Sequence, residues 1–278
     1  MVNPGVTPLV VLSIAGTDSG GGAGLAADLA TFAALGVHGA MVVAAVTAQD
    51  TMGVLAIHPI PAEVIAAQLD AVMADLSPAA IKTGMLGSPE AVELAAAACN
   101  APFPAVPLVV DPVLHATSGA ELASEAVLAA YREVLLPVAS VITPNAAEAR
   151  ALLGLDATDR TTAAELAAAL AALGPAVIIT GGPDASAGSN PTRCTDWLAI
   201  PGQDPVPIEH PAIDTTNDHG TGCTYSSALA AYLALGRPLA FAAEQAAVFT
   251  TRQLEASKYW TLGRGRGPVA HTLKEIPA

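Results

Sequence analysis

The stretch His219–Ser227, HGTGCTYSS, predicts a glycine turn followed by a helix and is the most informative part of this sequence. Its glycines come immediately before an apolar helical pattern, which predicts a helix over Gly220–Leu235. Glycine lets a backbone approach a ligand closely, and the free N–H groups at a helix start bind anions with the help of the helix dipole. Cys223 lies in this turn, where the same field is expected to lower the pKa of its thiol. The stretch therefore predicts a phosphoryl-binding turn beside a base or nucleophile.

Outward from this turn, short apolar runs alternate with helical patterns. The runs are apolar on both faces, which is typical of a parallel sheet covered by helices, so we expect a doubly wound α/β fold with helices on both faces of the sheet. Two later runs, Arg193–Ile200 and Pro205–His210, predict an antiparallel pair. No linker or repeat divides the chain, so we expect one domain over residues 1–278. The expected strands are Leu9–Ala15, Ala40–Val46, Ala79–Lys82, Leu108–Val110, Ser140–Ile142 and Ala176–Ile179. The other expected helices are Gly24–Leu35, Ala62–Asp75, Pro89–Cys99, Ser124–Leu135, Ala146–Leu152, Thr162–Leu173 and Leu239–Glu255.

Composition excludes several classes of partner. The net charge is −14 and only 4% of residues are aromatic, which argues against nucleic acid and anionic membranes as partners. Three widely spaced cysteines without a C-x-x-C argue against a disulfide framework or a structural zinc site. Residues 1–8 contain no basic region of a signal peptide, and the alanine-rich stretches are too short to cross a membrane. We expect a cytoplasmic protein.

Two loops that follow strands near the N-terminus are candidate ligand contacts. Residues 15–24, AGTDSGGGAG, contain no Gly-Lys-Ser/Thr and so are not a P-loop; their glycines favour a ligand-contacting loop over a bare tight turn. Gln49 follows the second expected strand and offers one acceptor and two donors. Those groups suit an aminopyrimidine or a similar ring, although a polar loop after a strand is more often structural.

Four later strand ends also carry polar residues. Lys82 faces either a phosphate or solvent, and Asp111 serves either a metal and phosphate site or a cap. Asn145 with Glu148 three residues later imitates a helix capping box; alternatively Glu148 and Asp111 hold Mg²⁺ beside a triphosphate. Thr180-Gly181-Gly182 follows another apolar strand. Because carboxyl ends of parallel strands meet at one edge, we expect these loops to converge there.

The order of these motifs resembles the ribokinase-like superfamily, and within it the hydroxymethylpyrimidine/phosphomethylpyrimidine kinases of thiamine biosynthesis. The matching stretches are AGTDSGGGAGLAADLATFAALG, VTAQDT, IKTGMLG, VVDPV, ITPNAAEA, HGTGCT and, near the end, GRGRGPVAH. The resemblance implies a three-layer α/β/α kinase that uses ATP and Mg²⁺. It further implies a homodimer and two successive phosphorylations, of a pyrimidine hydroxymethyl group and then of its monophosphate.

The resemblance also implies roles for individual residues. Cys223 would accept the hydroxyl proton, where most of the superfamily has an aspartate base, and Gly220, Thr221 and Gly222 would direct N–H groups at the transferring phosphoryl group. Asp111 and Glu148 would serve the metal and the phosphates. The pyrimidine would contact Gln49, Ala23, Asp28, Met85 and Val113. The ATP site would include Lys82, Asn145, Thr180 and Gly181.

The chain departs from the family's pattern at five positions. The family commonly has lysines where this chain has Ala30 and Thr180 and near Thr117, and it commonly has Asn for Asp50 and Thr for Asp218. Fewer cations and two added carboxylates lower the positive potential around an anionic substrate. This predicts a larger effect on the second step, whose substrate is already charged, than on ATP binding.

Three other functions compete with the pyrimidine kinase. Pyridoxal also carries a ring hydroxymethyl group, so a pyridoxal kinase of the same superfamily is the nearest alternative; Gln49, Met85 and Cys223 favour the pyrimidine. The absent lysines motivate a ligand-sensing protein that binds without catalysis. A dinucleotide oxidoreductase lacks support because no clean G-x-G-x-x-G is followed by a ribose-binding acid.

Overall fold

A computed structural model describes residues 6–99, 106–114, 122–181 and 192–272. Its strands are β1 (Val10–Gly16), β2 (His38–Asp50), β3 (Gly53–Pro59), β4 (Ala80–Thr83), β5 (Leu108–Val110), β6 (Val141–Ile142), β7 (Ala176–Ile179), β8 (Arg193–Ala199) and β9 (Val206–Pro211). They form one sheet in the order β3-β2-β1-β4-β5-β6-β7-β8-β9. Pairing is parallel from β2 to β7 in this order, whereas β3, β8 and β9 pair antiparallel. The predicted mostly parallel α/β fold is confirmed.

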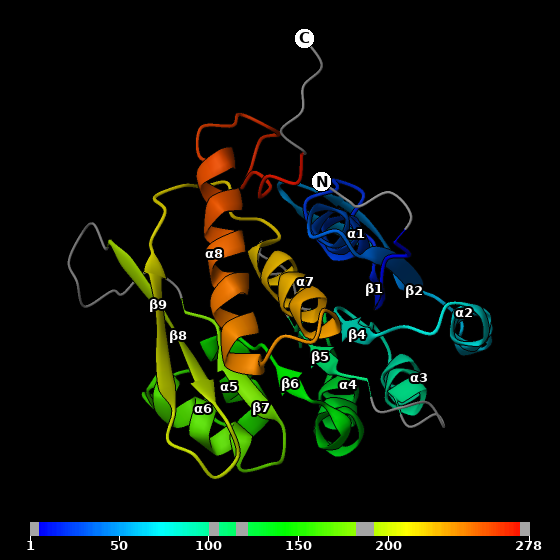
Figure 1. The fold of residues 1–278 in the computed structure, drawn as a ribbon, viewed down its shortest axis with the longest axis horizontal. Coiled ribbons are helices and arrows are strands. Elements are labelled where there is room, and N and C mark those ends of the chain that lie inside the picture. Colours follow the sequence, from blue (N-terminus) through cyan, green and yellow to red (C-terminus); the bar gives the residue numbers. More distant parts are fainter. Residues whose placement is uncertain (1–5, 100–105, 115–121, 182–191, 273–278) are drawn as a thin grey trace.

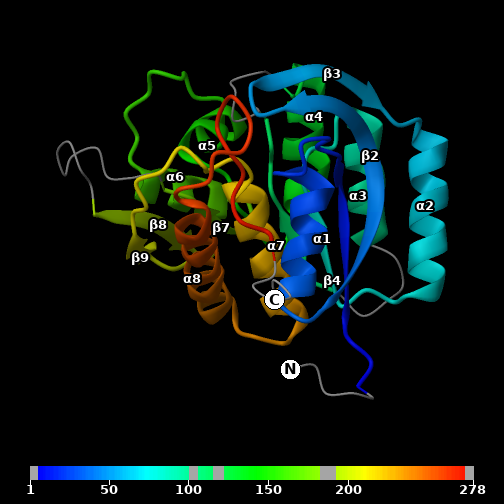
Figure 2. The same ribbon diagram turned by 90° about the horizontal axis from the view of Figure 1, so that it is seen from above.

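Helices cover both faces of the sheet (Figures 1 and 2). One face carries α1 (Gly24–Ala34), α7 (Thr221–Ala234) and α8 (Leu239–Ser257). The other carries α2 (Ala62–Asp75), α3 (Pro89–Cys99), α4 (Glu125–Ala130), α5 (Ala146–Leu153) and α6 (Ala163–Ala171). Successive side chains of a strand point to opposite faces, so Val11 joins the cluster around Phe32 and Leu12 joins the cluster around Ile65. No helix in the described part of the chain is long and apolar enough to cross a bilayer.

The N-terminal edge of the sheet differs from the prediction. The sequence analysis missed β3, a seven-residue edge strand whose residues are mostly exposed. Asp50 makes the turn into this strand, since its Oδ1 accepts hydrogen bonds from Met52 N at 2.8 Å and Gly53 N at 3.1 Å. The helix expected over Ser124–Leu135 is also altered, because α4 ends at Ala130 and continues as one wider π-helical turn over Tyr131–Leu135.

The helix predicted after the glycine turn is α7, which packs against β1, β4 and β5. Gly220 precedes it with φ +89°, a left-handed conformation that favours glycine. A Cβ added there would lie 1.8 Å from Gly22 O, so a side chain at this position would collide with backbone. Gly220 thus allows the loop after β1 to contact the start of α7. This contact places the glycine-rich loop after β1 and the glycine turn before α7 at the same edge of the sheet.

Candidate active site

A cavity of about 730 Å³ lies at the carboxyl ends of the parallel strands. Residues at or just after the ends of β1, β4, β5, β6 and β7 contribute to its wall, as the sequence predicts for converging loops. Of the candidate residues, all but Asp28 and Lys82 line this cavity. The lining candidates are Ala23, Gln49, Met85, Asp111, Val113, Asn145, Glu148, Thr180, Gly181, Gly220, Thr221, Gly222 and Cys223. A smaller adjoining cavity of about 180 Å³ shares Gln49 and His219 with it.

Asp28 and Lys82 form an ion pair in the protein interior instead of lining the cavity. Lys82 Nζ donates hydrogen bonds to both carboxylate oxygens of Asp28, at 2.9 and 3.0 Å, and neither side chain is exposed. Ser13 and Ser227 donate their hydroxyl groups to the same carboxylate, at 2.6 and 2.7 Å. This placement differs from the expectation that Lys82 faces a phosphate or solvent and that Asp28 contacts a pyrimidine. Each charge is balanced by the other, which is the usual condition for burying both.

Cys223 lines the cavity in the first turn of α7 and is half-buried. Burial raises the pKa of its thiol to about 12; the Lys82 ammonium opposes this rise, and the Asp111 and Asp28 carboxylates add to it. The expectation of a lowered pKa is wrong for the free protein, because desolvation and two carboxylates outweigh one ammonium. The thiol is therefore protonated at neutral pH.

The glycine turn before α7 forms part of the wall of the same cavity. Gly220, Thr221 and Gly222 all line it. Thr221 N already donates to Asp218 O at 3.2 Å, and Thr221 Oγ1 donates to the same carbonyl at 2.6 Å. The turn is thus closed on Asp218, and the N–H of Thr221 would have to be shared with a bound anion.

Asp111 and Glu148 bring two buried carboxylates to the cavity wall. Burial raises the pKa of Glu148 to about 8, and the charge of Asp111 adds to this effect. Burial also raises the pKa of Asp111, against the Lys82 ammonium and a 2.9 Å hydrogen bond from the Ser226 hydroxyl. Two carboxylates that are costly to ionise in the free protein would be stabilised as anions by a divalent cation.

This acidic pair fits Mg²⁺ bound together with a nucleotide. Mg²⁺ commonly takes one or two carboxylates and completes its shell with waters and phosphate oxygens. Among the described residues, no group of three or more His, Cys, Asp or Glu side chains is arranged to hold a metal ion. The two carboxylates would therefore need waters and phosphate oxygens to complete the shell of a bound cation.

The polar residues after β6 and β7 are held by local hydrogen bonds. Asn145 Oδ1 accepts from Ala147 N and Glu148 N, while Glu148 Oε2 accepts from Asn145 N at 2.9 Å, so the capping box is present at the start of α5. Gly181 N donates to Asp196 Oδ1 at 2.7 Å. The helix-capping role of Asn145 and Glu148 is therefore compatible with their place in the cavity wall.

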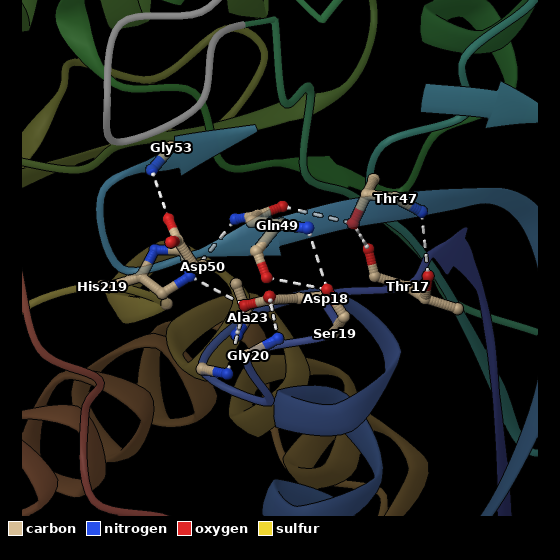
Figure 3. Close-up of polar contacts among 12 residues, drawn as sticks. Thr17, Asp18, Ser19, Gly20, Ala23, Thr47, Gln49, Asp50, Gly53 and His219 are labelled. Carbon is tan, nitrogen blue, oxygen red and sulfur yellow. Dashed lines mark hydrogen bonds and ion pairs between the residues drawn. The ribbon is translucent and has the colours of Figure 1, made fainter. Parts of the chain in front are cut away.

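The sequence analysis missed a contact between Asp18 and His219 (Figure 3). His219 Nε2 lies 2.8 Å from Asp18 Oδ2, and the Asp18 carboxylate also accepts backbone N–H groups from its own loop. Burial favours the neutral acid, but the hydrogen bonds from His219 and the backbone outweigh it and lower the pKa of Asp18. Gln49 Nε2 lies 3.4 Å from the same His219 nitrogen. The glycine-rich loop that holds Asp18 and the glycine turn that holds His219 are both visible in the sequence. Their contact was missed because the two residues are 201 positions apart.

Comparisons with known proteins identify the family of this chain. A family model described as phosphomethylpyrimidine kinase matches residues 18–270. The chain belongs to the phosphomethylpyrimidine kinase family. It is 44% identical over 266 residues to a hydroxymethylpyrimidine/phosphomethylpyrimidine kinase of Haemophilus influenzae, covering 94% of this chain and 96% of that protein. It is 42% identical over 265 residues to a thiamine biosynthetic bifunctional enzyme of Arabidopsis thaliana, covering 94% of this chain and 49% of that protein. The pyridoxal kinase of Staphylococcus aureus, solved with pyridoxal, superposes with a TM-score of 0.84 at 31% identity, covering 96% of this chain and 94% of that one.

The two carboxylates that the sequence analysis expected to lower the positive potential, Asp50 and Asp218, are paired with arginines. Arg264 donates to Asp50 Oδ2 at 2.9 Å, and Arg266 donates from Nε and from its terminal nitrogen to the two oxygens of Asp218. The sequence argument counted both carboxylates as uncompensated, so it overstated the loss of positive potential. Ala30 is half-buried on α1, while Thr117 lies outside the described residues.

Proposed function

We propose that this kinase transfers the γ-phosphoryl group of ATP to 4-amino-5-hydroxymethyl-2-methylpyrimidine and then to the resulting monophosphate. It would act in thiamine biosynthesis in the cytoplasm, as one ribokinase-like domain over residues 1–278. The single observation that carries the proposal is the shared cavity. Its wall contains the glycine turn and Cys223 together with Gln49, Asn145 and Thr180. The names of the relatives support the same substrate.

The pyrimidine would bind between the loop after β1 and the end of β2. Gln49 would pair with the ring through its amide, which has one acceptor and two donors. Met85, Ala23 and Val113 line the cavity and would enclose the ring with apolar contacts. Met85 is 9% exposed and packs near Gly16, so its thioether is held in place by the strand end.

Phosphoryl transfer would take place at the start of α7. Backbone N–H groups of Gly220, Thr221 and Gly222 would stabilise charge on the transferring group, because fixed donors in a water-poor site need no reorganisation. The substrate oxygen would attack the γ-phosphorus, the bond to ADP would break, and the alcohol proton would pass to Cys223 in its thiolate form. Lys82 would favour the thiolate through its charge, without touching the nucleotide.

Asp111 and Glu148 would hold the cation, and Asn145, Thr180 and Gly181 would line the nucleotide part of the cavity. When bound, Mg²⁺ supplies neutralisation of the charge that develops on the phosphate oxygens. Neutralising the Asp111 carboxylate would also remove one of the two charges that raise the pKa of Cys223. The thiol would then ionise more easily than in the free protein.

The decisive experiment supplies the pyrimidine alcohol and ATP and follows mono- and diphosphate over time. We expect the monophosphate to form first and then to be consumed. Binding of the alcohol without ADP formation would contradict the proposal and favour a ligand-sensing protein. Accumulation of the monophosphate without diphosphate would remove the second step only.

A pyridoxal kinase is the second candidate, favoured by the structural similarity to the Staphylococcus aureus enzyme. The two candidates differ in kcat/KM for the two alcohols. We expect the pyrimidine to be preferred because Gln49 offers both donors and an acceptor to an aminopyrimidine edge. A higher kcat/KM for pyridoxal would reverse the assignment.

We also propose that the protein is a homodimer that associates through β3. This strand ends the sheet order, and its outward face carries exposed Leu55 (80% exposed) and Ile57. Met41, Val46 and Met52 add further exposed apolar side chains on β2 and the turn. An apolar edge strand invites pairing with another chain unless it is covered. A second copy of the chain would cover it.

A further inference from the structure

The segment 262–267, LGRGRG, forms a strap that we call the arginine strap. It lies between the β2–β3 turn and the start of α7, and Figure 2 shows the red C-terminal segment approaching the end of the β2–β3 hairpin. Arg264 N and Gly265 N both donate to Thr51 Oγ1, at 3.0 and 3.1 Å. On the other side, His219 N donates to Gly267 O at 3.0 Å. The backbone on both sides of Arg266 is thus anchored.

Close packing fixes the strap further. A Cβ added at Gly265 would lie 2.0 Å from Thr51 O, and one added at Gly267 would lie 1.8 Å from Asn217 Oδ1. Neither position leaves room for a side chain. The Arg266 side chain between them is about half exposed, so it can change partners while its backbone stays in place.

Arg266 lies in the wall of the main cavity, next to the glycine turn. Among the described residues it is the only arginine or lysine in the wall of the main cavity. It is held by Asp218, which immediately precedes the turn His219–Gly222 and closes it through Thr221. A guanidinium forms bidentate hydrogen bonds with a phosphate, just as it does with a carboxylate.

Arg266 is also on the pyrimidine side of the site. It lines the smaller cavity together with Gln49 and His219, whereas Asn145 and Thr180 line the main cavity only. An anion that reaches Arg266 from this side belongs to the substrate that Gln49 holds. The alcohol carries no such anion, but its monophosphate does.

We propose that Arg266 binds the phosphate of the monophosphate substrate in the second phosphorylation, exchanging Asp218 for that phosphate. This inference rests on the proposed function. A phosphate oxygen of the monophosphate attacks the γ-phosphorus of ATP, the bond to ADP breaks, and a diphosphate forms. Because the Arg266–Asp218 pair is partly exposed, it contributes little to stability and is cheaply exchanged.

The test measures KM and kcat with the alcohol and, separately, with the monophosphate. Arg266→Ala should raise KM for the monophosphate roughly ten- to a hundredfold, the effect of losing a charge-assisted hydrogen-bond pair. KM for the alcohol and for ATP should change by less than about twofold. Asp218→Asn frees Arg266 from its carboxylate partner and should lower KM for the monophosphate.

Arg264→Ala is the matched control, since Arg264 lies on the same strap, pairs with Asp50 and lines neither cavity. It should leave both KM values unchanged, and thermal melting should show that each variant is folded. An Arg266→Ala enzyme with unchanged KM for the monophosphate, or with an equal rise for the alcohol or ATP, would overturn the proposal. So would a wild type that phosphorylates the alcohol only. If the wild type turns over neither pyrimidine, the proposed function itself fails.

Discussion

The Lys82–Asp28 ion pair should contribute strongly to the stability of the fold, because both of its charges are fully buried. We predict that Lys82→Met, which keeps the length of the side chain and removes its ammonium, lowers the free energy of unfolding by about 3–5 kcal/mol. Asp28 would keep the hydroxyl hydrogen bonds of Ser13 and Ser227 but would lose its counter-charge. In a chain of this length each kcal/mol is worth about 2–4 °C, so the melting temperature should fall by roughly 6–20 °C.

Urea denaturation followed by far-UV circular dichroism measures the change. Arg193→Met is the matched control, because it breaks an exposed pair with Glu209 at 2.7 Å and should cost only about 0–1 kcal/mol. The double substitution Lys82→Met with Asp28→Asn should cost less than the sum of the two single changes, since it removes both charges together. Additive single effects, or a Lys82→Met cost no larger than the control, would refute the reasoning.

Three other predictions follow from the site and the sheet edge. Cys223→Ala should lower kcat roughly 10²–10⁴-fold, the usual contribution of a general base, with little change in ATP affinity; unchanged turnover would remove Cys223 from the mechanism. The pKa of Glu148 is about 8 in the fold against 4.5 unfolded, so the native state holds the extra proton. Wild-type stability relative to Glu148→Gln should therefore fall as pH rises from 4.5 to about 8, measured by urea denaturation, and a flat difference would contradict the raised pKa. Leu55→Asp should shift the protein from dimer to monomer in sedimentation velocity, and a monomeric wild type would contradict the proposed interface.

Much of the fold and most of the cavity wall were predictable from local pattern. Apolar runs separated by helical periods predict parallel strands, and the shared direction of those strands brings their ends together. Asp111, Glu148 and Cys223 were expected at one edge for this reason, and all three line the cavity. The capping alternative for Asn145 was also visible locally, because the box spans only four residues.

Long-range pairing could not be predicted in the same way. A lysine at a strand end has the same sequence pattern whether it faces solvent or a buried carboxylate, and Asp28 lies 54 positions from Lys82. Arg266 lies 48 positions from Asp218, and Arg264 lies 214 positions from Asp50. Charge counting along the sequence therefore misjudged the potential at the site, because each counter-charge comes from a distant segment.

These pairings explain how a protein with a net charge of −14 can offer a cavity to polyanions. Asp18 lies against His219, Asp218 is bound by Arg266, and the high pKa of Glu148 keeps that side chain largely protonated at neutral pH. The acidic side chains in the wall are thus largely paired or neutral before any ligand arrives. Arriving phosphates and their cation would exchange partners with these groups instead of meeting bare carboxylates. The binding free energy then depends on which pair is exchanged most easily, and the partly exposed Arg266–Asp218 pair costs the least to break.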